Sequence, residues 1–398
     1  MGWPDLLDFA PPYRSTGELL CCCSMIEGFA TPEGTARYRE RFPEFKDAGH
    51  FRQPQNAPGP AGLWFSSMGI GTYLGEPDEA SDQLYTDAIS TALRRGINLV
   101  DTAINYRHQR SERNIRAAIS RLISEGEINR DELIVCSKAG YLSFDGAVPA
   151  DPRAYFMREY VEPGVFKPAE LAGGMHCMSP GYLLNQLERS RKNLGLGTID
   201  VYYIHNPESQ LGDVSREEFR QRIKSAFGAL ERAVKDGKIR FYGIASWSAF
   251  RVAESEQAYM SLPTCVELAE QAGGRDHHFR FVQLPFNLAM PEAHALPNQV
   301  ADREHLSALE YARKAGLAVI GSASLYQAQL TSNLPLFLAE KIGMQTDAER
   351  ALQFARSTPG LLTSLVGMGR PAHVFENINV AAQEPMKPEQ WQALFSRT

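Results

Sequence analysis

Eight short apolar runs, each followed by a longer segment of mixed polarity, constrain the fold of this 398-residue chain more than any other feature. The runs are rich in β-branched residues and nearly continuously apolar, which is typical of parallel strands whose outer face is covered by helices. They span residues 67–72, 97–103, 133–138, 199–205, 240–246, 279–286, 317–322 and 361–368. Eight repeated strand-helix units favour a closed barrel over an open sheet.

The segments between the runs have the spacing of amphipathic helices. Residues 115–122 and 223–230 both place apolar side chains at i, i+3, i+4 and i+7. Another helix is predicted to begin at Ser179 and Pro180, an N-cap followed by proline, and to end at Gly195. No GxGxxG turn follows the first run, which argues against a dinucleotide-binding Rossmann start. We therefore predict an α/β fold, a (β/α)8 TIM barrel.

Two parts of the chain interrupt this repeat. Residues 1–50 precede it and are rich in Pro, Gly and charge, so we expect an N-terminal extension followed by a barrel domain over residues 51–398. Residues 139–178 are far longer than a connecting loop needs to be, and residues 285–301 also follow a strand. Both are expected at the carboxyl ends of the strands, as lid loops that set the substrate. Four histidines in predicted loops are interpreted as surface or lid residues: His176, His277, His278 and His294.

Composition narrows the function classes. The chain has 41 Lys and Arg against 47 Asp and Glu, a formal charge of −6, and the two signs are interspersed, so neither a nucleic acid nor a membrane is an expected partner. No apolar stretch approaches the ~18 residues of a membrane span, and the first residues lack a secretory signal, which predicts a cytoplasmic protein. Cys21, Cys22 and Cys23 are contiguous and the other three cysteines are scattered, so we expect reduced thiols and no metal site.

Polar side chains close several of the predicted strands. Asp101, Lys138 and His205 stand at three strand ends, and Tyr106 follows shortly after Asp101. A tyrosine hydroxyl can protonate a carbonyl oxygen, a neighbouring lysine stabilises the phenolate, and an aspartate keeps that lysine charged. A histidine facing the same oxygen can orient the substrate. This set suits hydride transfer to a carbonyl, with a cofactor supplying the redox chemistry.

Motifs in a fixed order give this chain a clear resemblance to the aldo-keto reductases. They are GIGT at 69–72, GINLVDTAINY at 96–106, SKAG at 137–140, LERSRKNLGLGTIDVYYIH at 187–205, GIAS at 243–246, VQLPFN at 282–287 and the pair Glu376-Asn377. Each motif is weak alone, but together they cover roughly residues 50–385 and fall at predicted strand ends.

The resemblance implies a catalytic tetrad of Asp101, Tyr106, Lys138 and His205, with Tyr106 as the proton donor. It also implies a nicotinamide cofactor across the barrel mouth, NADP in preference to NAD, and a small carbonyl or alcohol substrate. Ser246 and Gln283 would hold the carboxamide, and Glu376 and Asn377 would lie near the adenine. The remaining implied cofactor contacts are Gly71, Thr72, Asp101, Ser322, Leu325, Gly367, Met368, Gly369, Arg370 and His373.

Three positions depart from the family pattern. Trp247 replaces the asparagine that usually follows the serine of the GIAS-like strand, and Ser324 stands where many members have proline. Arg107 replaces the glycine that commonly follows the tetrad tyrosine, which is expected to add a cation at the mouth and suggests an oxygen-rich or anionic substrate such as a sugar. Arg370 is expected to bind the 2′-phosphate of NADP, because a guanidinium can fork onto a phosphate.

Two other function classes remain open from the residues alone. A barrel of this kind can keep a cofactor site and serve as a regulatory or non-catalytic subunit, although the intact tetrad disfavours that reading. Lys138 could also act as a Schiff-base nucleophile in an aldolase or isomerase. The Glu376-Asn377 pair counts against this second alternative.

Overall fold

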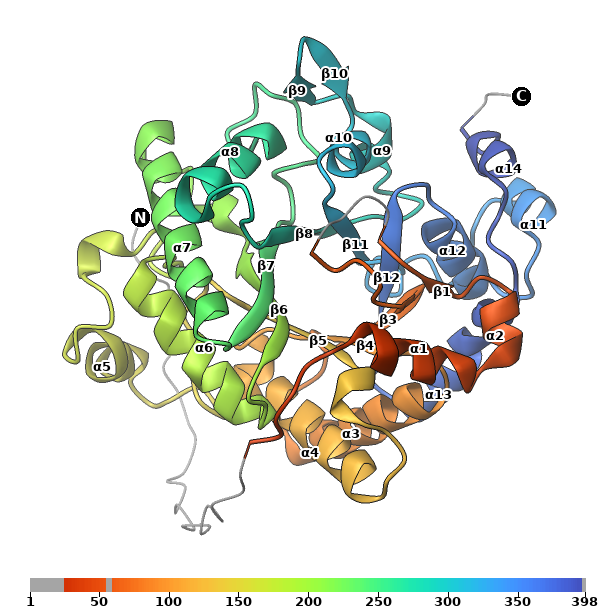
Figure 1. The fold of residues 1–398 in the computed structure, drawn as a ribbon, viewed down its shortest axis with the longest axis horizontal. Helices are drawn as coiled ribbons and strands as arrows, with labels where there is room; N and C mark the ends of the chain where they lie inside the picture. The colour runs from red at the N-terminus through yellow and green to blue at the C-terminus, as the bar shows by residue number, and fades with distance from the viewer. Residues whose placement is uncertain (1–24, 55–58, 396–398) are drawn as a thin grey trace.

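A closed parallel barrel of eight strands forms the centre of the molecule (Figure 1), in a computed structural model that describes residues 25–54 and 59–395. Its strands are β3 (Met68–Gly71), β4 (Leu99–Asp101), β5 (Ile134–Ala139), β6 (Ile199–His205), β7 (Ile239–Ala245), β8 (Phe279–Pro285), β11 (Ala318–Ser322) and β12 (Leu361–Gly367). They pair in the order β11-β12-β3-β4-β5-β6-β7-β8, and each lies within or beside one of the eight predicted runs. The predicted (β/α)8 barrel is confirmed.

Helices surround the barrel, as Figure 1 shows. One follows each strand in turn: α3 (Glu79–Arg94), α4 (Arg110–Ser124), α6 (Pro180–Leu194), α7 (Arg216–Lys235), α8 (Leu262–Gly273), α10 (Ala308–Lys314), α12 (Asp347–Arg356) and α13 (Pro371–Ile378). Shorter helices are α1 (Pro32–Glu40), α2 (Pro43–Asp47), α5 (Pro152–Phe156), α9 (Glu292–Ala295), α11 (Leu336–Ile342) and α14 (Pro388–Gln392). A small hairpin of β9 (Gln299–Ala301) and β10 (Glu304–Leu306) lies outside the barrel.

Helix α6 begins and ends where its sequence predicts. Gly195 adopts the left-handed conformation at φ +67°, which satisfies the last turn as a C-cap. Ser179 occupies the N-cap position, but its side chain makes no capping hydrogen bond, and its hydroxyl accepts one from the Cys177 thiol at 3.4 Å. The proline after it fixes the first turn by its own geometry.

The barrel interior follows the two-residue period of its strands. Side chains at alternate positions point inward, so Ile134, Cys136 and Lys138 line the interior from one end of β5 to the other. The inward residues are apolar where the strands begin and polar where they end. This gradient closes the lower barrel with a dry core and leaves the carboxyl ends for chemistry.

Small residues inside the barrel make room for large ones. A β-carbon on Gly243 of β7 would lie 2.2 Å from the Phe281 carbonyl oxygen and 2.9 Å from the Tyr203 ring. No other residue fits there, because real β-carbons do not approach other atoms so closely. The glycine of the GIAS motif is therefore explained by packing rather than by contact with a ligand.

Residues that precede β3 close the amino-terminal end of the barrel. A short hairpin of β1 (Phe51–Arg52) and β2 (Phe65–Ser66) inserts the fully buried Phe65 into the barrel core. The Tyr38 hydroxyl of α1 donates to the Leu93 carbonyl oxygen in the last turn of α3, at 2.5 Å. The Ala30 amide donates to the Asp200 carboxylate at 2.7 Å. The described part of the extension therefore packs in an ordered way against the barrel, and its helices α1 and α2 were not predicted from the sequence.

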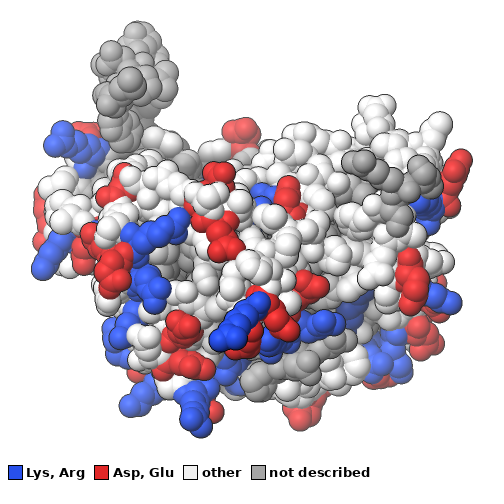
Figure 2. Space-filling model, turned by 90° about the horizontal axis from the view of Figure 1, so that it is seen from above, with Lys and Arg blue, Asp and Glu red and all other residues white. Residues whose placement is uncertain are grey.

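Positive and negative side chains alternate over the surface that Figure 2 shows, as expected from the interspersed charges of the sequence. None of the helices within the described ranges combines the length and the apolar character needed to cross a bilayer. Cys136, Cys177 and Cys265 are buried free thiols, as predicted. The Cys21–Cys23 run lies outside the described residues.

Candidate active site

A large cavity of about 920 Å³ opens at the carboxyl ends of the strands. Thirteen of the predicted site residues line it: Gly71, Thr72, Asp101, Tyr106, His205, Ser246, Gln283, Ser322, Leu325, Gly367, Gly369, Arg370 and His373. Lys138 lies directly beneath it and is fully buried. The residues selected from strand ends and motifs therefore converge on one site.

The ammonium group of Lys138 links Asp101 to Tyr106 at the floor of this cavity. Its Nζ lies 2.5 Å from Oδ2 of Asp101 and 3.3 Å from the hydroxyl of Tyr106, and it donates a third hydrogen bond to the Thr102 carbonyl oxygen at 2.7 Å. Gln283 donates to the other carboxylate oxygen of Asp101 at 2.8 Å. A charge buried this deeply is tolerated only when it is paired and fully hydrogen-bonded.

Burial and this ion pair act in opposite directions on the acid-base groups. Burial raises the pKa of Tyr106, and the positive charge of Lys138 opposes that rise. Burial alone would lower the pKa of Lys138, but the attraction of Asp101 and Tyr106 outweighs it and raises that pKa, so the lysine stays charged. Burial and the nearby Lys138 lower the pKa of His205 far below its ordinary value. At neutral pH the site holds a protonated tyrosine, a lysine cation and a neutral histidine.

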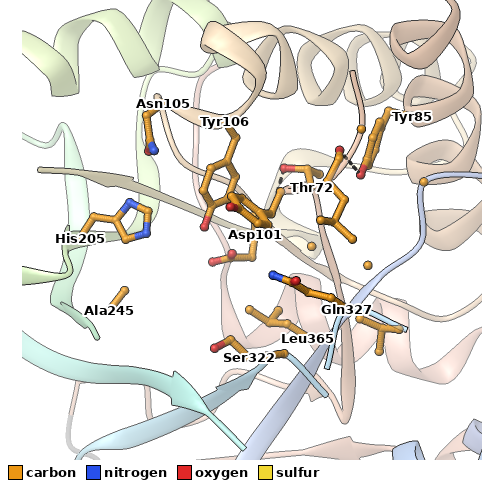
Figure 3. A pocket seen from close by; sticks show the side chains of 18 of the residues that line it. Thr72, Tyr85, Asp101, Asn105, Tyr106, His205, Ala245, Ser322, Gln327 and Leu365 are labelled. Carbon is orange, nitrogen blue, oxygen red and sulfur yellow. Dashed lines mark hydrogen bonds between the residues drawn. The ribbon is translucent and has the colours of Figure 1, made fainter. Parts of the chain in front are cut away.

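Tyr106 and His205 face a common space, as Figure 3 shows. Their ring centroids lie 5.7 Å apart at 76°, and the Nδ1 atom of His205 is buried without a hydrogen-bond partner among the described residues. A carbonyl oxygen in this space can accept a proton from the tyrosine while the neutral histidine orients it. The arrangement is that of a general acid with an orienting group.

The turn after Tyr106 is strained. Arg107, His108 and Gln109 have φ values of +47°, +55° and +71°, in the left-handed region that favours glycine. Arg107 is 6% exposed, and its guanidinium binds Asn114 and Asp82, each at 2.7 Å. These buried contacts stabilise the turn. The prediction that Arg107 adds a cation at the mouth is therefore wrong, because its side chain points away from the cavity and is buried between α3 and α4.

The long segment after β5 forms one wall of the cavity, as predicted for residues 139–178. Tyr141, Leu142, Ser143, Phe144 and Met175 line the cavity. The rest of the segment is held by its own aromatic cluster, which comprises Leu142, Tyr155, Tyr160, Phe166, Cys177 and Tyr182. This lid is therefore a packed subdomain with a small core.

His176 fixes the lid to the catalytic residues. It is 1% exposed, and its Nε2 lies 2.7 Å from the carbonyl oxygen of His205, while its Nδ1 lies 2.9 Å from the amide nitrogen of Gln210. A β-carbon on Gly140 would come within 2.6 Å of the imidazole, so only glycine fits beneath it. His277 lies outside the lid and is buried, so the prediction of a surface or lid residue is wrong for His277. It holds for His176, which belongs to the lid but is buried within it. Nothing in the local sequence indicates this, because the partners are more than 25 residues away.

Acidification should destabilise the protein through His176. Burial lowers its pKa from the ordinary 6.5 to about 4, so between these values the unfolded chain binds a proton that the folded chain refuses. The free energy of unfolding therefore falls as pH drops below 6.5, by about 2 kcal/mol between pH 7 and pH 5 for this residue alone. Urea unfolding of the wild type and of His176→Gln at both pH values measures it. An equal pH slope in the two proteins would contradict the assignment.

Glu208 organises the start of the loop after β7. Its Oε1 accepts hydrogen bonds from the Ser246 hydroxyl at 2.8 Å and from the amides of Trp247 and Ser248 at 2.8 and 3.1 Å. The Ser246 hydroxyl in turn accepts from the Ala249 amide at 2.8 Å. Ser246 is thus held rigidly at the cavity wall. Glu208 was not among the predicted site residues, although its place three residues after His205 is a signal that points to it.

The other half of the cavity lies along the ends of β11 and β12. Here the lining includes Ser322 and Leu325 from one loop and Gly367, Arg370 and His373 from the other. A β-carbon on Gly367 would touch only Leu74, at 3.9 Å, so the glycine leaves open space above the strand. Helix α13 begins at Pro371, so its amino-terminal end, with Arg370 and His373, stands at this end of the cavity. An extended anionic group fits this arrangement.

Three predicted cofactor contacts do not line the cavity. Met368 is 1% exposed and packs into the core, while Asn377 is 5% exposed and Glu376 is exposed on α13. Glu376 and Asn377 lie one turn or more beyond Pro371, so a ligand reaches them only by extending past the cavity along this helix. The assignment of these three residues stays a prediction.

The segment of residues 285–301 does not form part of the cavity lining among the described residues. Phe286 and His294 pack instead against the Trp391 ring of α14, at centroid distances of 6.5 and 4.6 Å. The prediction that this loop helps to set the substrate is therefore wrong. The described residues also contain no group of three or more His, Cys, Asp or Glu side chains that could hold a metal ion.

Comparison with known proteins gives matches over most of the chain. The "Putative voltage-gated potassium channel subunit beta" of Schizosaccharomyces pombe is 25% identical over 362 residues, 83% of this chain and 89% of that protein. The D-threo-aldose 1-dehydrogenase of Pseudomonas sp is 25% identical over 265 residues, 57% of this chain and 75% of that protein.

A solved structure shares the fold. The aldo/keto reductase from Klebsiella pneumoniae in complex with NADP and acetate has a TM-score of 0.57 at 18% identity, and the match covers 86% of this chain and 94% of that one. The family model described as "Aldo/keto reductase family" matches residues 67–396, which include the barrel and the cavity. This chain belongs to the aldo/keto reductase family of oxidoreductases.

Proposed function

We propose that this protein reduces a carbonyl compound to an alcohol, reversibly, with NADP as the preferred cofactor and Tyr106 as the proton donor. One observation carries the proposal: the buried Lys138 ammonium joins the Asp101 carboxylate to the Tyr106 hydroxyl at the floor of the cavity. Similar proteins that include two reductases and the aldose dehydrogenase support the same reaction class.

The cavity fits a nicotinamide dinucleotide. Its volume of about 920 Å³ lies at the upper end of the range for small-molecule sites. Ser246 and Gln283 lie near the tetrad, where they would hold the nicotinamide, and the loops at Leu325 and Gly367 would hold the phosphates. The NADP-bound structural neighbour supports this placement. When bound, the cofactor supplies the hydride for reduction or accepts it for oxidation.

The residues of the chain transfer one proton to or from the substrate. The Tyr106 hydroxyl donates to the substrate oxygen, and the neutral His205 ring orients that oxygen. Lys138 stabilises the resulting phenolate, and Asp101 keeps the lysine charged and fixed. In the oxidation direction the same groups take the proton from the alcohol.

The geometry disfavours the Schiff-base alternative. Lys138 is fully buried, and its ammonium is hydrogen-bonded to three oxygens. A lysine nucleophile must lose its proton and reach the substrate, and this environment does the opposite by raising the lysine's pKa.

The test of the proposed function is oxidation of NADPH by a panel of aldehydes and ketones, followed by the absorbance of the reduced nicotinamide. The expected result is substrate-dependent turnover that is lost in a Tyr106 variant. Turnover that persists in this variant, or a protein that binds NADPH but reduces no carbonyl compound, would contradict the proposal.

Replacing Arg370 by Ala should weaken NADPH binding about tenfold and change NADH binding less than twofold, because only NADPH carries the 2′-phosphate. Arg370 is exposed at the cavity rim, at the N-cap of α13, so its loss leaves the fold intact. Dissociation constants from nicotinamide fluorescence measure the effect, and Arg370→Lys is the matched control that keeps the charge. Equal weakening for both cofactors would show that Arg370 does not read the phosphate.

A further inference from the structure

We propose that the substrate of this site is an uncharged carbonyl compound that contains a flat ring and whose polar groups are held by Asn105 and Asn206. This inference rests on the proposed carbonyl reduction and narrows its substrate class. The expectation was an oxygen-rich or anionic substrate, and the inference replaces its anionic alternative, because Arg107 points away from the cavity.

The substrate half of the cavity carries no free charge. Among the described residues that line the cavity, only Asp101 and Arg370 are Asp, Glu, Lys or Arg. Asp101 is neutralised by Lys138 at 2.5 Å, and Arg370 stands at the α13 end, away from the tetrad. Of the three histidines that line the cavity, His373 lies on α13 beside Arg370. Burial lowers the pKa of the other two, His108 and His205, so they are neutral at pH 7. A substrate carboxylate here would lose its hydration and gain no partner.

Aromatic faces surround the space in front of Tyr106. Tyr73 and Trp247 line the cavity and remain 58% and 44% exposed, so their rings have no protein partner on one side. The Tyr73 ring stands 5.1 Å from the Tyr106 ring, and the Tyr141 ring of the lid stands 5.3 Å from that of His205. Such walls favour a flat or ring-shaped molecule over a short flexible chain.

Two side-chain amides supply uncharged hydrogen-bonding groups beside the catalytic pair. Asn105 Oδ1 is buried without a hydrogen-bond partner among the described residues, and Figure 3 shows this side chain on the His205 side of Tyr106. A buried oxygen of this kind is costly unless a ligand donates to it. Asn206 follows His205 directly and lines the cavity, and its backbone has a φ of +44°. Its side-chain amide donates to the Tyr141 hydroxyl at 3.3 Å. Each amide can donate or accept, which suits hydroxyl or ether groups.

A pair of aldehydes matched in shape tests this inference: methyl 4-formylbenzoate, which is neutral, and 4-formylbenzoate, which is an anion. With NADPH, the wild type should reduce the ester with a kcat/KM at least about tenfold higher than that for the acid. Quenching of Trp247 fluorescence by each aldehyde gives the relative binding without turnover. Equal or preferred binding of the acid would overturn the inference.

Added cations should change this ratio only inside the cavity. Asn206→Lys should raise the kcat/KM for the acid relative to the ester by about tenfold. Trp247→Arg is the second variant, since Asn206 has a positive φ of +44°, at which a lysine is strained and the variant could fail to fold. Val148→Lys adds the same charge to an exposed position of the lid that does not line the cavity, where Val148 is 58% exposed, and should leave the ratio unchanged.

The outcomes separate this inference from the proposed function. If neither aldehyde is reduced but the ester still binds more tightly, the substrate class holds and the proposed reaction fails. If both are reduced equally and neither cavity variant changes the ratio, the reaction holds and the substrate class fails.

Discussion

Tyr106→Phe should lower turnover by about 10²–10⁴-fold, because Tyr106 carries the only hydroxyl among the described residues that lies both at the Lys138 ammonium and in the space that His205 faces. The aromatic ring should stay in place, since it packs against the Tyr73 ring. The Lys138 ammonium also lies 4.8 Å from its centroid. The measurement is kcat with a carbonyl substrate, together with the dissociation constant of NADPH and the melting temperature. The last two should be nearly unchanged.

Tyr73→Phe is the matched control. Tyr73 lines the same cavity and loses the same hydroxyl, but it does not contact Lys138. Its turnover should fall far less than that of Tyr106→Phe. A Tyr106→Phe protein with turnover close to that of the wild type would show that another group donates the proton.

Lys138→Met should have the second largest effect, on both turnover and stability. The substitution leaves the Asp101 carboxylate buried with Gln283 as its remaining side-chain partner, and breaking a buried pair in this way costs about 3–5 kcal/mol of unfolding free energy. Urea denaturation measures this loss. The double variant Asp101→Asn/Lys138→Met should recover much of the stability, since it removes both charges, but not the turnover.

The pH profile distinguishes the role of Lys138 from a purely structural one. The lysine charge holds the pKa of Tyr106 below the value that burial alone would give. Without it, that pKa rises, so the limb of the rate profile that reports Tyr106 ionisation should move to higher pH. This limb is the falling one in reduction, which needs the protonated tyrosine, and the rising one in oxidation. An unchanged limb in Lys138→Met, with turnover reduced, would assign the lysine to structure alone.

The barrel and its catalytic floor could be predicted because both follow from local periodicity. Residues at alternate positions of one strand share a side, so Asp101, Lys138 and His205 at three strand ends had to converge once the barrel was expected. Lys138 was the most informative of them, since a lysine that ends a buried strand needs a partner. The structure places Asp101 in that role.

The features that could not be predicted depend on contacts between distant segments. Arg107 looked like a cation at the mouth, but tertiary partners on α3 and α4 turn it away and stabilise a backbone conformation that usually takes glycine. His176 contacts His205 through the folded lid, and residues 285–301 pack against α14 near the other end of the chain. None of these pairings leaves a period or a motif in the sequence, because each depends on where loops meet in space.

The measurement that tests the central claim most directly is titration of the purified protein with NADPH and NADH, followed by nicotinamide emission and tryptophan quenching. Trp247 lines the cavity and Trp391 is fully buried, so Trp247→Phe identifies which quenching comes from the site. We expect saturable binding of NADPH that is tighter than the binding of NADH. The quenching of tryptophan fluorescence by NADPH should be lost in Trp247→Phe. Absence of saturable binding of either nucleotide would contradict it.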